Sequence, residues 1–249
     1  MAGSGHIQVG VVGARGRMGR QVVQTIEDSS TCDVLAAIDQ GDDLNLLNQC
    51  DVIVDFTTPE VVMATLEHCI KQGVHCVVGT TGFDDARLDQ LRTWLTEAPD
   101  VNVLVAPNFG IGAVLMMQFA QLAAPYFESV EIIELHHPDK IDAPSGTARR
   151  TAELIAQARL ERGVGASPDA TTQEIAGARG ASVGDVRVHS VRARGLVAHQ
   201  EVIFGGLGET LTIRHDSMDR SSFMPGVLLA VENIAAHRGL TVGLDSFLN

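Results

Sequence analysis

The sequence is short of cysteine, aromatic residues and long apolar segments. Only 4% of its 249 residues are aromatic, with one Trp and one Tyr. The few cysteines include no C-x-x-C pair and no finger-like spacing with histidine, which argues against a disulfide framework or a zinc site. We expect buried, reduced thiols instead. The four cysteines are Cys32, Cys50, Cys69 and Cys76.

Membrane and export signals are also missing from the sequence. No segment reaches the roughly 18 uninterrupted apolar residues that a membrane-spanning helix requires. The first residues, MAGSGHIQVGVVG, contain no basic segment followed by an apolar run and a cleavage site. The sequence therefore predicts a cytoplasmic protein with no membrane partner.

Basic residues are scarce relative to acidic ones. Lys and Arg together number 18, whereas Asp and Glu number 31, which gives a formal net charge of -13. This balance argues against nonspecific nucleic-acid binding, which depends on a cationic surface. If the ligand is an anion, positive potential must be concentrated locally in the fold.

Aliphatic residues are plentiful, and in the first half they occur in alternating strand-like and helix-like segments. The hydrophobic share is 45%. Strands that are apolar throughout, separated by amphipathic helices, indicate a parallel sheet covered on both faces, which is an α/β, Rossmann-like doubly wound arrangement. We expect strands at 6–13, 32–39, 51–57, 74–82 and 101–110, and helices at 17–28, 59–73 and 84–97, with Pro59 in the first turn of the second helix.

Glycine and polar residues gather where the predicted strands end. Ligands of doubly wound sheets lie beyond the carboxyl ends of the strands, so these positions predict a binding crevice rather than ordinary turns. They are 13–19, Asp39, 56–59, 79–82 and 106–110.

The glycine turn after the first strand resembles a dinucleotide-binding fingerprint. Gly13, Gly16 and Gly19 would let backbone N–H groups approach a pyrophosphate at a helix start. Asp39 ends the second strand, where a carboxylate binds ribose hydroxyls and favours NADH. Arg15 and Arg17 favour a 2′-phosphate, unless they belong to a solvated basic loop. We therefore expect that NADH is used and that NADPH is accepted.

The second half has a different pattern, which predicts a second, α+β domain. A helix at 111–127, a strand at 129–137 and a helix from 145 precede a long loop at 163–184. Three strands then follow in close succession, which is typical of antiparallel pairing. A closing helix from about 221 has the pattern of a cover helix for the first domain. We expect a dinucleotide domain of residues 1–110 completed by 221–249, and a substrate-binding and oligomerisation domain of 111–220.

The segment IELHHPDKIDAPSGTAR, residues 133–149, concentrates groups that handle protons and anions. Ser145 is a natural N-cap, and the N–H groups of Gly146 and Thr147 are suited to an anion, although plain capping is the simpler reading. His136 and His137 would end a strand with side chains on opposite faces, so one of them could be structural. Lys140 can deliver a proton. We expect no metal site, because adjacent histidines do not readily converge on one ion.

Within this segment, ELHHPDKIDAPSGTA resembles the signature of the 4-hydroxy-tetrahydrodipicolinate reductase family, long called dihydrodipicolinate reductase. The resemblance extends to VGVVGARGRMG, VVGTTGF, APNFGIGAVL and GETLTIRHDSMDRSSFMPGVLLA, and so covers the whole chain. It implies an N-terminal dinucleotide domain completed by the last helix, and a central domain that binds substrate and builds a homotetramer.

The resemblance also implies a reaction: reduction of a cyclic imine dicarboxylate by NADH or NADPH in diaminopimelate and lysine biosynthesis, with hydride added at ring C4. His136 would be a proton donor or acceptor and Lys140 the proton donor. The substrate carboxylates would be bound by His137, Ser145, Gly146 and Thr147. The implied cofactor-binding residues are Gly13, Ala14, Arg15, Gly16, Arg17, Met18, Asp39, Gly79, Thr80, Thr81, Ala106, Pro107, Asn108 and Phe109.

Two other functions fit parts of the sequence. A dehydrogenase of another small imino or keto acid, such as aspartate, would share the glycine turn but would not need the segment at 133–149. A module that senses NADH without turnover would tolerate loss of Lys140. The cofactor preference also stays open, because Gln40 follows Asp39 where some members of the resembled family carry arginine.

Overall fold

The computed structural model describes residues 5–248 and divides them into two compact units. The first unit runs to Ile111 and resumes at Arg220, and the second spans Gly112–Asp219. The sequence-based boundaries, at 110 and 221, differ from these by one residue each. Residues 1–4 and 249, which we assigned to the first domain, lie outside the described residues.

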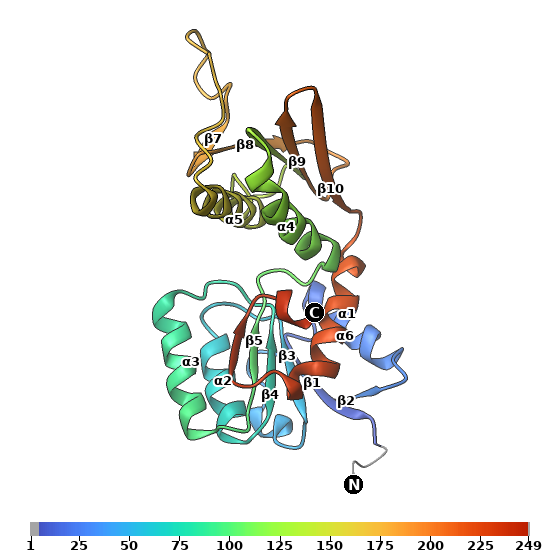
Figure 1. Ribbon diagram of the computed structural model, residues 1–249. Coiled ribbons are helices and arrows are strands. Elements are labelled where there is room, and N and C mark those ends of the chain that lie inside the picture. The colour runs from blue at the N-terminus through green and yellow to red at the C-terminus, as the bar shows by residue number, and fades with distance from the viewer. Residues whose placement is uncertain (1–4, 249) are drawn as a thin grey trace. The chain divides into compact units, whose positions relative to one another are not determined.

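The first unit is built on a parallel sheet, which is six-stranded within residues 5–248 (Figure 1). All of its neighbouring strands run parallel, so the predicted doubly wound sheet is confirmed. The edge strand β11 was not predicted, because three residues within the C-terminal segment carry no clear strand pattern. The order is β11 (Leu240–Val242), β5 (Val103–Val105), β4 (His75–Val78), β3 (Val52–Asp55), β1 (Ile7–Val12) and β2 (Cys32–Ile38).

Helices cover both faces of this sheet. In Figure 1, α2 (Val62–Lys71) and α3 (Asp85–Glu97) lie on one face, and α1 (Arg17–Glu27) and α6 (Met224–Asn233) lie on the other. The expected return of the last helix to the first domain is confirmed by its packing on α1, β3 and β4. The expectation for Pro59 was wrong: it lies in a separate turn, closed by hydrogen bonds to the Thr58 carbonyl, before α2 begins.

The second unit contains a mixed sheet, five-stranded among the residues described. Its order is β10 (Glu209–Ser217), β9 (Ala198–Gly206), β6 (Ser129–His136), β8 (Val186–Arg192) and β7 (Ala181–Val183), and β7 lies in the predicted long loop. The predicted antiparallel pairing holds for β9 and β10 but is wrong for β8 and β9, because β6 lies between them. The connection after β8 passes the end of β6, where the Ala193 N–H donates to the His136 carbonyl.

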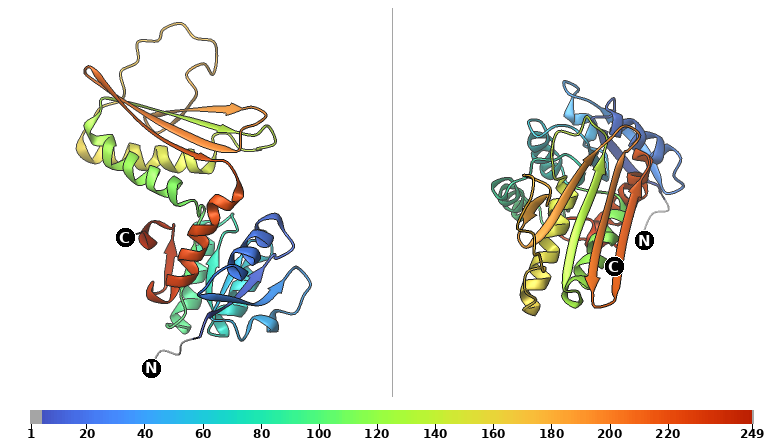
Figure 2. Two further views of the ribbon diagram at one scale, coloured as in Figure 1. Left: turned by 90° about the vertical axis from the view of Figure 1, so that its right-hand side faces the viewer. Right: turned by 90° about the horizontal axis from the view of Figure 1, so that it is seen from above.

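Two helices cover one face of the mixed sheet, namely α4 (Ile111–Ala123) and α5 (Gly146–Arg162) (Figure 2). Alternate residues of β6, Val130 and Ile132, are buried against Ala152 and Ile155 of α5. Within residues 5–248, no helix covers the other face of this sheet (Figure 1 and Figure 2). Short 3-10 helices occur at η1 (Leu44–Leu47), η2 (Ala124–Tyr126), η3 (Arg220–Phe223), η4 (Ile234–Ala236) and η5 (Asp245–Phe247).

Two further expectations concern cysteine and membranes. All four cysteines are unpaired and buried, as expected. In the described part of the chain, no helix has both the length and the apolar character needed to cross a bilayer.

Candidate active site

The glycine turn between β1 and α1 fits a pyrophosphate. Gly13 has a positive φ of 81° and lies so close to the Phe56 carbonyl oxygen that a Cβ atom would be 2.6 Å from it. A Cβ on Gly19 would overlap the Gly13 carbonyl oxygen. Gly16 is the N-cap of α1 and offers no side chain to the first-turn N–H groups. These groups therefore face an open backbone cradle, as an anion-binding helix start requires.

Backbone hydrogen bonds hold the loops at the carboxyl ends of the strands together. The Gly13 N–H donates to the Ile38 carbonyl, the Gly79 N–H to Asp55 and the Ala106 N–H to Val78, each at 2.9 Å. The cofactor residues expected from four strand ends therefore share one sheet edge. Among them, Arg15, Gly16, Arg17, Thr81 and Pro107 are exposed, Met18, Asp39, Gly79 and Asn108 are half-buried, and Gly13, Ala14, Thr80, Ala106 and Phe109 are buried.

The acidic residue at the end of β2 is tied to the glycine turn. Asp39 Oδ2 accepts the Arg15 N–H at 2.7 Å, and the Arg15 guanidinium donates to Asp42 at 2.8 Å. Arg17, the first residue of α1, is exposed. Of the two arginines expected to favour a 2′-phosphate, Arg15 thus has a carboxylate partner already, and Arg17 is the better candidate.

A buried carboxyl group lies below these loops, and sequence reasoning missed it. Asp55 is fully buried at the end of β3, and its Oδ1 accepts hydrogen bonds from the Thr80 hydroxyl at 2.6 Å and the Thr57 hydroxyl at 2.8 Å. Burial raises the pKa of Asp55, against the effect of these hydrogen bonds. The polar run at 56–59, directly after Asp55, was the signal that could have led to it. The Phe56 and Phe109 rings pack together with centroids 5.7 Å apart, so Phe109 supports the loops from within.

In the second unit, a tight turn returns the chain just after β6. The strand ends at His136, and the Lys140 N–H donates to the His137 carbonyl at 3.2 Å. Pro138 occupies the second position of this turn, which proline favours. His137 therefore lies one residue beyond the end of the strand, which we had expected to include it. The Lys140 Nζ donates to Asp142 Oδ1 at 2.6 Å.

The start of α5 has the predicted cap. Ser145 Oγ accepts the Ala148 N–H at 3.1 Å, and the side chain of Ser145 is almost fully buried. Gly146 is exposed, and a Cβ atom there would meet nothing within 4 Å. The Gly146 N–H donates to the Asp142 carboxylate. The helix start thus already binds one carboxylate of the chain itself, while Ser145 is committed to capping.

The histidine that ends β6 has partners that the sequence did not reveal. The His136 Nδ1 and Glu134 Oε2 are 2.6 Å apart, and the Glu134 side chain is fully buried. Arg192 of β8 donates to both oxygens of Glu134, at 2.7 and 2.8 Å. Burial alone would raise the pKa of Glu134, but the hydrogen bonds from Arg192, Ser190 and His136 outweigh it and lower the pKa to about 2.

The charge of His136 is set by opposing effects. Burial lowers the pKa of His136, and the Glu134 carboxylate acts against this shift. The nearby positive charges of Lys140 and Arg192 lower the pKa further. The net shift is downward, so His136 is neutral at neutral pH.

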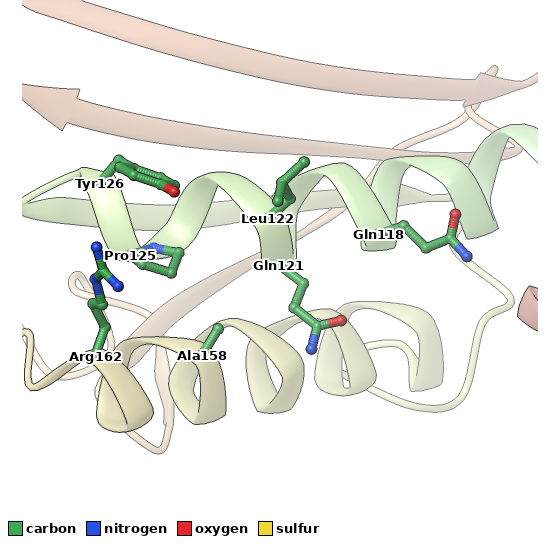
Figure 3. A pocket seen from close by; sticks show the side chains of 7 residues that line it. All are labelled: Gln118, Gln121, Leu122, Pro125, Tyr126, Ala158 and Arg162. Carbon is green, nitrogen blue, oxygen red and sulfur yellow. The ribbon is translucent and has the colours of Figure 1, made fainter.

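A surface hollow and the arrangement of possible metal ligands were compared with the predicted site residues. A hollow of about 370 Å³ lies between α4 and α5, lined by Gln121, Leu122, Tyr126 and Arg162 among others (Figure 3), and none of the predicted site residues lines it. Within residues 5–248, no group of three or more His, Cys, Asp or Glu side chains could hold a metal ion.

Both units match one protein family. Residues 7–109 match the family described as dihydrodipicolinate reductase, N-terminus. Residues 112–248 match dihydrodipicolinate reductase, C-terminus. The chain belongs to the dihydrodipicolinate reductase family. The resemblance stated from the sequence is therefore confirmed.

Relatives in this reductase family match over nearly their whole length. The 4-hydroxy-tetrahydrodipicolinate reductase of Thermobifida fusca is 62% identical, covering 97% of this chain and 99% of the relative. That of Nocardia farcinica is 60% identical, covering 98% and 99%. The solved structure of dipicolinate-bound dihydrodipicolinate reductase from Paenisporosarcina sp. TG-14 has a TM-score of 0.88 and 39% identity, covering 97% of this chain and 99% of that one.

Similarity beyond the reductase family concerns the fold alone. An amine dehydrogenase from Mycobacterium smegmatis has a TM-score of 0.62 at 12% identity, covering 97% of this chain and 96% of that one. The two-unit architecture is therefore shared with dehydrogenases of other substrates, and substrate choice must be argued from the residues of the site.

Proposed function

We infer that the protein is an oxidoreductase that reduces 4-hydroxy-tetrahydrodipicolinate to tetrahydrodipicolinate with NADH or NADPH, in diaminopimelate and lysine biosynthesis. The observation that carries this inference is the full-length match to reductases of that name at 60% and 62% identity. The dipicolinate-bound relative supports a cyclic dicarboxylate as the ligand. A dehydrogenase of another imino or keto acid is not favoured by these matches.

We propose that the first unit binds the nicotinamide cofactor and that the second unit binds the substrate. When bound, the cofactor would supply a hydride to ring C4; in the net reaction the 4-hydroxyl group is lost as water and one proton is taken up. The Gly13 to Gly19 turn would hold the pyrophosphate, Asp39 the adenine ribose, and the loops at 79–81 and 106–109 the nicotinamide. The glycine cradle and the uncapped N–H groups of α1 support this assignment.

Lys140 is our candidate for the proton donor. An ammonium group can donate a proton, whereas the lowered pKa of His136 keeps that imidazole neutral. His136 can then accept a hydrogen bond or a proton at Nε2. We propose that His137, Gly146 and Thr147 bind the substrate carboxylates, and that Ser145 acts by fixing the start of α5.

We propose that the protein forms a homotetramer through the helix-free face of the mixed sheet. The alternate residues of β6 and β9 on this face, Ile133, Leu135 and Ile203, are apolar and only half-buried. Val191 of β8 lies beside them and is 38% exposed. Glu131 and Glu201 lie between these apolar residues, opposite Ile203 and Ile133. An uncovered sheet face that carries apolar side chains is suited to an assembly interface. We also propose a cytoplasmic location, as expected for a biosynthetic enzyme that uses a nicotinamide cofactor.

The test is enzymatic. Purified protein is mixed with NADH and 4-hydroxy-tetrahydrodipicolinate, and the nicotinamide absorbance is followed. We expect catalytic loss of NADH that depends on the substrate and that 2,6-dipicolinate inhibits. A protein that binds NADH but does not consume it would instead be a sensing module, and consumption with aspartate-type imino acids alone would indicate a different dehydrogenase.

A further inference from the structure

The Glu134 carboxylate joins three elements of the second unit. It forms hydrogen bonds with His136 at the end of its own strand and with Arg192 on β8. It also accepts the Ser145 N–H at the start of α5, at 3.1 Å. We propose that Glu134 and Arg192 are positioning residues for the reaction, and that they fix His136 and the carboxylate-binding helix start relative to each other. This positioning role adds detail to the proposed reductase function and rests on it.

The hydrogen bond to Glu134 fixes the tautomer of His136. An ionised carboxylate can only accept hydrogen bonds, and Glu134 is ionised because its pKa is lowered to about 2. The His136 Nδ1 must therefore carry the hydrogen that lies between the two side chains. In the neutral imidazole this leaves Nε2 with a free electron pair. Glu134 thus determines which ring atom can accept from the substrate.

The position of Glu134 is in turn fixed by Arg192. Arg192 binds both of its oxygens, which fixes the plane of the carboxylate as well as its place. The same guanidinium donates to the Asp142 carbonyl at 2.7 Å. Arg192 therefore holds the strand end and the loop that carries Lys140 and Asp142. A lysine in its place could not make this set of planar contacts.

The charged pair also stands at a place in the strand where apolar packing would be expected. Arg192 and Glu134 are charged groups in a buried setting, where an apolar pair of similar volume is often equally stable. Val130 and Ile132, which precede Glu134 on the same face of β6, are packed against apolar residues. The charged pair therefore interrupts an apolar face at the point where the strand reaches the proposed proton-transfer residues.

The same strand provides a matched control. Glu131 lies on the opposite face of β6, where His189 Nε2 is 2.6 Å from it and Arg179 also bonds to it. It forms a second glutamate, histidine and arginine cluster that contains none of the proposed catalytic or binding residues. Glu131→Gln therefore removes a similar carboxylate from the same strand without touching His136. Because Glu131 lies on the proposed assembly surface, the oligomeric state of the Glu131→Gln protein is measured in parallel.

The decisive experiment reads the imidazole directly, so it does not depend on the reductase assay. Long-range ¹H–¹⁵N NMR of the full-length protein, with His136 assigned by a His136→Asn variant, gives the tautomer and the pKa. We expect the Nδ1–H tautomer in the wild type and in Glu131→Gln. The charged groups that face His136 are Glu134, Lys140 and Arg192. We expect Glu134→Gln to lower the pKa of His136 and to increase the Nε2–H tautomer, and Arg192→Ala to raise the pKa.

Steady-state kinetics of the same variants provide a second, independent measurement. We expect Glu134→Gln to lower turnover by ~10²-fold with less than a threefold change in the KM for substrate. The reason is that the substitution disturbs the orientation of His136, which acts in proton transfer. The acidic limb of its pH profile should move to lower pH, and Arg192→Lys should lose at least tenfold in turnover. If Glu134→Gln does not fold, the opposite pKa shift of Arg192→Ala and the loss in Arg192→Lys carry the test.

An unchanged tautomer and pKa of His136 in both Glu134→Gln and Arg192→Ala would overturn the proposal. Equal losses of turnover in Glu134→Gln and Glu131→Gln would also overturn it, because they would indicate a general effect on the strand. A wild-type protein without reductase activity would instead remove the proposed function, and the NMR result would still decide whether Glu134 fixes the imidazole.

Discussion

The Lys140 Nζ lies 2.6 Å from Asp142 Oδ1, and the same carboxylate accepts the N–H of Gly146 at the start of α5. Two groups that we place around the dicarboxylate substrate are therefore bridged by a carboxylate of the protein. The bridge keeps a positive charge near an anion-binding helix start within a chain whose formal net charge is -13. It also means that Asp142 and a substrate carboxylate would compete for these donors.

This competition predicts the effect of Asp142→Asn. The substitution removes the negative charge but keeps the size of the side chain, so we expect dipicolinate to bind about threefold more tightly, in line with the modest energy of an exposed ion pair. Calorimetric titration measures the affinity, with Asp139→Asn in the preceding turn as the control. Weaker binding in Asp142→Asn would show that Asp142 orients Lys140 for the ligand.

Lys140 itself is expected to act in catalysis more than in binding. We expect Lys140→Ala to lower turnover by ~10²-fold or more while the KM for substrate changes little, because the proton donor acts in the transition state. Steady-state kinetics with 4-hydroxy-tetrahydrodipicolinate separates the two parameters. A loss confined to KM would make Lys140 a carboxylate contact only.

We expect Arg17 to determine how well NADPH is used relative to NADH. Arg15 is paired with Asp42, whereas Arg17 is exposed at the start of α1, close in sequence to the pyrophosphate turn. We expect Arg17→Ala to lower kcat/KM for NADPH by roughly tenfold and to leave that for NADH nearly unchanged. Equal losses with both cofactors would show that Arg17 does not read the 2′-phosphate.

Glu134 also makes stability depend on pH. Its pKa in the folded protein is about 2, below its ordinary value of 4.5, so the stabilisation is complete above the ordinary value and is lost as the pH falls toward about 2. Between about pH 6 and pH 3 the loss from this group is about 2 kcal/mol. Urea unfolding at both values should show a correspondingly smaller decrease in Glu134→Gln than in the wild type. Equal decreases would place the pKa of Glu134 near its ordinary value.

The proposed tetramer is tested by a charge on the helix-free sheet face. Ile203→Glu places a carboxylate on this face, opposite Glu131 and diagonal to Ile133, so we expect sedimentation to show dissociation into smaller species. Leu160→Glu, at a position of α5 that is 74% exposed, is the control and should not change the mass. An unchanged mass in Ile203→Glu would exclude this face as the interface.

Much of the fold and part of the site followed from local patterns. The alternation of apolar strands with helices, the glycine turn and the Ser145 cap depend on residues close in sequence. The pairing of β6 between β8 and β9 does not, and Arg192 meets Glu134 across 58 positions of the chain. Glu134 was accessible in principle, because it stands two residues before His136 and so shares its face of the strand. The sequence could not indicate that its partner comes from β8.

In the proposed reaction this chain transfers a hydride from a nicotinamide cofactor to the ring of a dicarboxylate. Reduction of 4-hydroxy-tetrahydrodipicolinate with NADH deuterated at the transferable C4 position, followed by NMR of the product, tests it most directly. We expect many turnovers per protein, with deuterium at ring C4 of tetrahydrodipicolinate. Binding of NADH without turnover, or a product that carries no deuterium at C4, would contradict it.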